Sequence, residues 1–202
     1  MEPKTLLDIL AVAERLKSVP RHAYTSAGRR ESVAEHSWRV SLMAMLLADQ
    51  FPDLDMDRVI RMCLIPDLGE AFTGDIPTFE KTDTHRDTED RLLQSWVAGF
   101  PDRQRTEFRT LLAEMEAQTT VEARLYKALD KLEAVIQHNE GDIATWLPLE
   151  YGLQRPYGTE NVQFSPYLRR LKAEIDRQTE AKIAAAGGLP DKNPKSSPGT
   201  GY

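Results

Sequence analysis

The chain has 202 residues, of which 41% are apolar, and it carries a formal net charge of −6 at pH 7. This length suits one domain with a sizeable core and is too short for two of ordinary size. The acidic balance argues against binding a nucleic-acid polymer, because backbone binding needs clustered positive charge. The apolar runs are too short for a signal-peptide core or a membrane span. With its single cysteine, Cys63, the chain is therefore expected to be cytoplasmic.

Apolar residues recur at helical spacing through most of the sequence, whereas the alternation typical of strands is almost absent. The pattern predicts a single all-α domain over residues 1–186. The expected helices are Thr5–Ser18, Ser32–Gln50, Asp57–Leu68, Arg86–Ala98, Asp102–Ala117, Val121–Asn139 and Ser165–Ala186, with a shorter one over Ile143–Leu149. Residues 187–202 are rich in glycine and proline and nearly devoid of apolar side chains, which predicts a disordered tail.

Two of these helices carry polar residues on their inner faces. His36 shares a face with Val40, and Asp67 ends an apolar row that includes Cys63. Taken alone, the histidine is more simply a hydrogen-bonded core residue, and the aspartate is as well explained as a helix-end carboxylate. A buried carboxylate needs a partner, however, and a metal ion is a good one.

Several short segments occur in the order found in one known family of phosphohydrolases. They are Leu16–Arg21, Glu31–Ser37, Gly69–Glu70 with Thr73–Pro77, Ala128–Glu133 and Trp146–Tyr151. Over about residues 5–175 the chain resembles the bacterial HD-domain 5′-deoxynucleotidases and their eukaryotic relatives. The resemblance implies an HD-domain helical bundle.

By this resemblance, a divalent ion (Mn²⁺, Co²⁺, Mg²⁺ or Zn²⁺) is held by His36, Asp67, Asp130 and the residue before Asp67. The family has a histidine there and this chain has Pro66, so one ligand is missing and the ion is bound weakly or lost. Periodicity alone makes Asp130 a solvated acid, so its helix must pack on two sides if it is a ligand. A proline inside a helix costs ~3 kcal/mol and disfavours helical angles at Ile65, which predicts that the helix ends or kinks before Asp67.

The resemblance also implies roles around the metal. Glu70 positions or activates the attacking water, and Asp75 serves as a second acid or base. Arg21 clamps the phosphate through paired donors. His22 replaces a tryptophan that crowds the sugar in relatives that prefer deoxynucleotides, which removes the basis for expecting rejection of a 2′-hydroxyl. Lys131 adds positive charge to the substrate site, or is simply a solvated lysine.

These features predict metal-dependent hydrolysis of nucleoside (deoxy)5′-monophosphates, impaired by Pro66. The alternative is a catalytically inactive module that binds a nucleotide or a partner protein in the same pocket. Di-iron oxygenases of this fold need further histidines between the positions of Pro66–Asp67 and Asp130. Only His85 lies in that interval, which argues against an oxygenase. The resemblance implies a homodimer as well. Trp146 lies either in the contact between the two subunits or in the core of each subunit.

Overall fold

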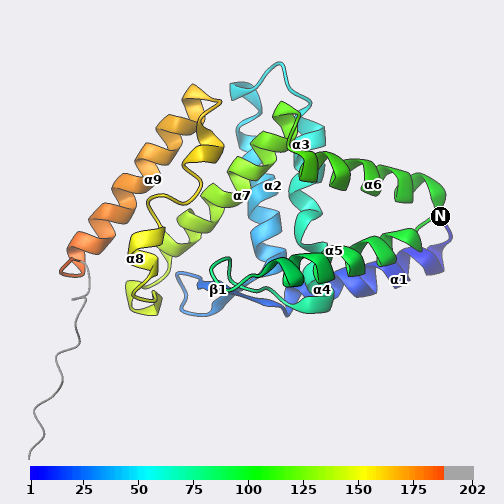
Figure 1. The fold of residues 1–202 in the computed structure, drawn as a ribbon, viewed down its shortest axis with the longest axis horizontal. Coiled ribbons are helices and arrows are strands. Elements are labelled where there is room, and N and C mark those ends of the chain that lie inside the picture. Colours follow the sequence, from blue (N-terminus) through cyan, green and yellow to red (C-terminus); the bar gives the residue numbers. More distant parts are fainter. Residues whose placement is uncertain (189–202) are drawn as a thin grey trace, which may run out of the picture.

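The structure, a computed structural model, describes residues 1–188 as a bundle of helices with one small hairpin (Figure 1). The α-helices are α1 (Pro3–Ala13), α2 (Val33–Leu46), α3 (Met56–Leu64), α4 (Glu70–Thr73), α5 (Asp83–Ala98), α6 (Asp102–Ala117), α7 (Val121–Glu140), α8 (Glu150–Leu153) and α9 (Pro166–Ala185). Short 3₁₀ turns are η1 (Glu14–Lys17), η2 (Ala48–Gln50), η3 (Pro66–Gly69), η4 (Ile143–Thr145) and η5 (Glu160–Val162). The expected helical domain is confirmed.

Helix α7 runs through the middle of the bundle and packs against α2, α3, α6 and α9 (Figure 1). Its leucines Leu125, Leu129 and Leu132 are fully buried. Because neighbouring helices cover several sides of α7, Asp130 also lies inside the bundle, although it is off the apolar stripe. Packing on two sides, which the resemblance required of this helix, is confirmed.

An antiparallel hairpin, β1 (Pro20–Tyr24) with β2 (Arg30–Ser32), leads directly into α2. The sequence did not reveal it, because strands of five and three residues offer too few positions for alternation to be seen. Ser32 begins α2 with a capping box: its side chain accepts from the Glu35 N–H, and the Glu35 carboxylate accepts from the Ser32 N–H. The hairpin thus lies beside the first turn of α2.

The hairpin also rests on the end of α7. Gly141 follows this helix, and a Cβ at this position would lie only 2.8 Å from the carbonyl oxygen of Tyr24. Only glycine permits this approach without displacing the backbone. The Gln137 side-chain amide donates to the same carbonyl at 2.8 Å. These contacts fix β1 against α7, where the site residues of both elements meet.

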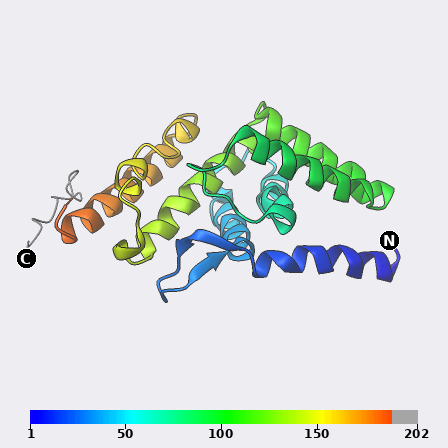
Figure 2. The ribbon, with the colours of Figure 1, turned by 60° about the horizontal axis from the view of Figure 1, so that its bottom comes forward.

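Helix α1 projects from the bundle (Figure 2) and buries none of its residues. Trp146, considered from the sequence as a dimer contact, is only 6% exposed, and its indole N–H donates to the carbonyl of His138. It therefore belongs to the core of this chain and not to an outer surface. The homodimer stays a prediction.

Two glycines close the last helix. The N–H groups of Gly187 and Gly188 donate to the carbonyls of Ala184 and Ile183, and both glycines have positive φ. Residues 189–202 of the expected tail lie outside the described residues. Among the helices of residues 1–188, none combines the length and the apolar character that crossing a membrane requires.

Candidate metal centre and substrate cavity

Three predicted metal ligands come together from segments far apart in the sequence. His36 lies on α2, Asp67 on η3 and Asp130 on α7. The Nε2 atom of His36 lies 3.1 Å from Oδ1 of Asp130 and 3.7 Å from Oδ2 of Asp67. One donor atom from each residue lies within 4.8 Å of the others. One imidazole nitrogen and two carboxylate oxygens fit a hard or borderline divalent ion.

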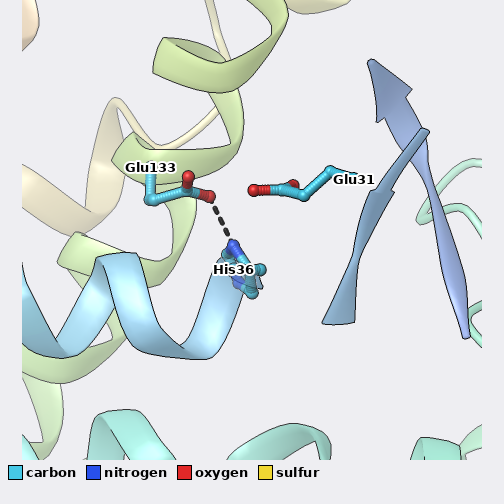
Figure 3. Close-up of side chains that lie close together, drawn as sticks. All are labelled: Glu31, His36 and Glu133. Carbon is cyan, nitrogen blue, oxygen red and sulfur yellow. Dashed lines mark hydrogen bonds and ion pairs between the residues drawn. The ribbon is translucent and has the colours of Figure 1, made fainter. Parts of the chain in front are cut away.

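Glu133 holds the opposite edge of the imidazole ring (Figure 3). Its carboxylate is hydrogen-bonded to His36 Nδ1 and is fully buried, and Glu31 approaches from β2. A carboxylate at Nδ1 orients the ring and leaves Nε2 for a metal ion. Glu133 was not predicted from the sequence, although its position three residues after Asp130 on one helix was an available signal.

Charge around His36 is finely balanced. Burial and the positive charge of Arg21 lower its pKa, but hydrogen bonds with Asp130 and Glu133 outweigh them and raise the pKa to about 10. Burial opposes ionisation of Asp130, yet the charges of Lys127 and His36 prevail and hold its pKa below the usual range. Because a ligand histidine must be neutral, a metal ion bound here would displace a proton from Nε2.

Pro66 disturbs the backbone less than the sequence suggested. Helix α3 ends at Leu64, and Pro66 opens η3, where its fixed φ is suitable and no helical N–H is required. The predicted end of the helix before Asp67 is confirmed, whereas the cost of an interior proline does not apply. His85 does not replace the lost ligand, because its exposed side chain accepts from the Thr82 N–H as a cap of α5.

Glu70, the predicted base, is buried at the start of α4. The ammonium of Lys81 lies 3.7 Å from its carboxylate and 2.6 Å from that of Glu89. Burial, followed by the negative charges of Asp67 and Asp75, raises the pKa of Glu70 to about 9. A cation bound at the neighbouring Asp67 would favour the ionised carboxylate that a base needs.

Arg21 lies between the metal centre and a cavity. Its Nη1 atom is 2.7 Å from Oε2 of Glu31 and 3.5 Å from Oε2 of Glu133. These carboxylates hold the guanidinium in place, and its other N–H donors can still reach a ligand. The cavity that Arg21 lines has a volume of about 240 Å³.

The cavity also contains other residues expected to contact substrate. Its lining includes His22 and Asp75, the aromatic side chains of Phe79 and Tyr157, and the polar side chains of His138, Glu150 and Gln154. The buried Nε2 of His22 lies 3.1 Å from Oε1 of Glu150 but forms no hydrogen bond with it. Gly74, with φ of 77°, turns the chain after α4 and directs Asp75 into this lining.

The lysine beside the metal centre is Lys127, which was not predicted from the sequence. It donates from Nζ to Oδ2 of Asp130 at 2.9 Å, an i,i+3 pair on α7. The ammonium of Lys131 lies instead 4.5 Å from the ring centroid of Tyr157, a cavity residue. Lys131 therefore stays a predicted substrate contact on the cavity side.

Pro66→His is expected to tighten Co²⁺ binding at least tenfold, because it returns a fourth donor next to Asp67. The melting temperature of the metal-free protein should not rise, since Pro66 occupies a position that suits proline. Calorimetric Co²⁺ titration and thermal melts of both proteins test this. Unchanged Co²⁺ affinity would contradict the missing-ligand explanation.

Metal-free protein, prepared with a chelator, should lose stability as the pH rises from 7 to 9.5. The pKa of His36 is raised from 6.5 to about 10, so in this window the folded state holds a proton that the unfolded state has released. Glu70, raised to about 9, acts in the same direction. Urea unfolding should show a loss on the order of 5 kcal/mol, of which His36 contributes about half. An equal loss in His36→Gln would show that His36 is not responsible.

Comparison with known proteins identifies the family of this chain. Residues 13–172 match the family described as HD domain. The 5′-deoxynucleotidase HDDC2 of Homo sapiens is 32% identical over 193 residues, covering 93% of this chain and 92% of that protein. The 5′-deoxynucleotidase hdd1 of Schizosaccharomyces pombe is 28% identical, covering 66% and 70%. A predicted metal-dependent phosphohydrolase from Magnetospirillum magnetotacticum MS-1 superposes with a TM-score of 0.77 at 26% identity, covering 93% and 98%. The chain belongs to the HD-domain family.

Proposed function

We propose that the protein hydrolyses nucleoside 5′-monophosphates to nucleoside and phosphate, using a divalent metal ion. The observation that carries this proposal is the position of Arg21. It lines the cavity, and it also contacts Glu133, the residue that holds His36 in the metal centre. A phosphate bound by Arg21 would lie between an ion and a pocket for the nucleoside. The names of the relatives, 5′-deoxynucleotidases, support the same substrate class.

Substrate binding would use both ends of this arrangement. Phe79 and Tyr157 offer aromatic surfaces in the cavity lining, which suit a nucleoside. Arg21, already oriented by its carboxylate partners, binds phosphate oxygens with its remaining donors. His22 offers a polar side chain where the sugar would lie, so both ribose and deoxyribose substrates are expected.

His36, Asp67 and Asp130 would hold the ion, which when bound polarises a phosphoryl oxygen and lowers the pKa of water. Glu70 accepts the proton of the attacking water, and Asp75, whose charge acts on Glu70, passes a proton on to the departing 5′-oxygen. The burial of Glu70 excludes bulk water from this step. Lys81, anchored by Glu89, keeps a positive charge beside the base.

A second candidate function is nucleotide or partner binding without catalysis. The specific observation in its favour is that the positive charges of His36 and Lys127 already face the carboxylates of Asp67 and Asp130. Those charges balance without a metal ion. Nucleotide binding that is unaffected by Mn²⁺, together with no phosphate release, would distinguish this module from the enzyme.

Glu70→Gln should lower phosphate release from nucleoside monophosphates at least 100-fold, because the amide cannot accept the proton of the attacking water. Its Mn²⁺ affinity should stay within about threefold of wild type, since Glu70 is not among the clustered donors. Phosphate release with Mn²⁺ or Co²⁺, across ribo- and deoxynucleotides, is the measurement. Glu116→Gln, an exposed glutamate on α6, is the matched control.

Two results would count against the proposal. Full turnover by Glu70→Gln would remove this residue from the chemistry. Wild-type protein that binds the nucleotides but releases no phosphate with either metal would replace the hydrolase by the binding module.

A further inference from the structure

The single positive charge of Arg21 does not neutralise a phosphate monoester, which carries nearly two negative charges at neutral pH. The guanidinium already lies beside two buried carboxylates, those of Glu31 and Glu133. Its single positive charge is therefore more than matched before any substrate arrives. A phosphate site at this place needs a further cation.

Lys127 reaches the metal centre from α7, the helix that also carries Asp130 and Glu133. Arg21 and Lys127 therefore flank the metal centre from two elements, the hairpin and α7. Arg21 contacts Glu133, which holds His36, and Lys127 contacts Asp130. Lys127 also remains accessible, because 37% of its side chain is exposed.

The carboxylate of Asp130 lies between Lys127 and His36. Its Oδ1 faces Nε2 of His36 at 3.1 Å, whereas Oδ2 accepts from Nζ of Lys127 at 2.9 Å. A lysine ammonium has three N–H donors, so this bond leaves donors for a ligand. With a divalent ion at the centre, Asp67 and Asp130 are balanced by it, and the charge of Lys127 is available to an anion.

We infer that Lys127 is a phosphate-binding residue of the proposed nucleotidase, donating to a phosphoryl oxygen of a substrate held at the His36–Asp67–Asp130 centre. This inference rests on the proposed function and names a contact within it. Arg21 and Lys127 bind the phosphate together, and Lys127 contributes most when the metal is present. Lys131, one residue beyond Asp130, lies on the cavity side and does not contact the phosphate.

The alternative is that Lys127 merely anchors Asp130 for the metal. The two roles predict opposite results for metal binding. Loss of an anchor lowers metal affinity, as is typical when a residue behind a ligand is removed. Loss of a phosphate contact leaves metal affinity intact or raises it, because a positive charge near the ion has been removed.

The test is Lys127→Met, measured by calorimetry with Mn²⁺ alone and then, at saturating Mn²⁺, with inorganic phosphate, a nucleoside monophosphate and its nucleoside. We expect phosphate and nucleotide affinity to fall at least tenfold, nucleoside affinity to stay unchanged, and Mn²⁺ affinity to be no lower than wild type. Lys127→Arg, which keeps the charge, should recover most of the phosphate binding. Arg124→Met is the matched control, because Arg124 lies one turn earlier on α7 and packs over Phe164.

Several outcomes would overturn the inference. Weaker Mn²⁺ binding with unchanged phosphate affinity would make Lys127 an anchor of Asp130. A loss of phosphate binding in Lys131→Met but not in Lys127→Met would move the contact to Lys131. Wild-type protein that binds neither Mn²⁺ nor nucleotide would reject the proposed function together with the inference. Wild-type protein that binds both, while Lys127→Met binds phosphate equally well, would reject the inference alone.

Discussion

The carboxylate of Glu133 is the group on which both halves of the site depend. It is fully buried, and an ion in such a place must be paired or the fold loses several kcal/mol. Three cationic or polar partners reach it: His36 through Nδ1, Arg21 at 3.5 Å and Arg39 at 3.6 Å. One buried charge therefore requires β1 and α2 to meet at α7. His36, the proposed metal ligand, and Arg21, the proposed phosphate-binding residue, are placed by the same constraint.

This dependence explains why the hairpin and the helices form a single site. The capping box at Ser32 fixes where α2 begins, and so places His36 one turn inside the helix. The close approach at Gly141 holds β1 on α7, which brings Arg21 to Glu133. Arg39 continues the link with bonds to Gln137 and Glu140 on α7. A substitution that separates hairpin from helix would thus disturb metal and phosphate binding together.

Much of the fold could be predicted from the sequence, because helical periodicity extends over long segments. The inward position of His36 follows from its apolar neighbours in the same way. Periodicity failed at Asp130, since a helix covered on several sides has no single inner face. The hairpin was too short to show alternation, although it carries Arg21 and His22.

The remaining parts of the site depend on contacts between distant segments. Glu31 and Glu133 lie 102 positions apart in the numbering yet share one arginine, and no local pattern predicts such a pair.

Lys127 and Glu133 flank Asp130 at i−3 and i+3, so helical spacing alone could have nominated them. The effect of Pro66 was also local in origin: the helix simply ends before it, and Asp67 keeps its place near His36.

The proposed centre requires that His36, Asp67 and Asp130 hold a divalent ion although Pro66 supplies no ligand. Titration of metal-free protein with Mn²⁺, monitored by electron paramagnetic resonance, measures this binding. We expect one ion per chain in the wild type and at least tenfold weaker binding in Asp130→Asn. No bound Mn²⁺ in wild type, or equal affinity in Asp130→Asn, would contradict the proposed centre.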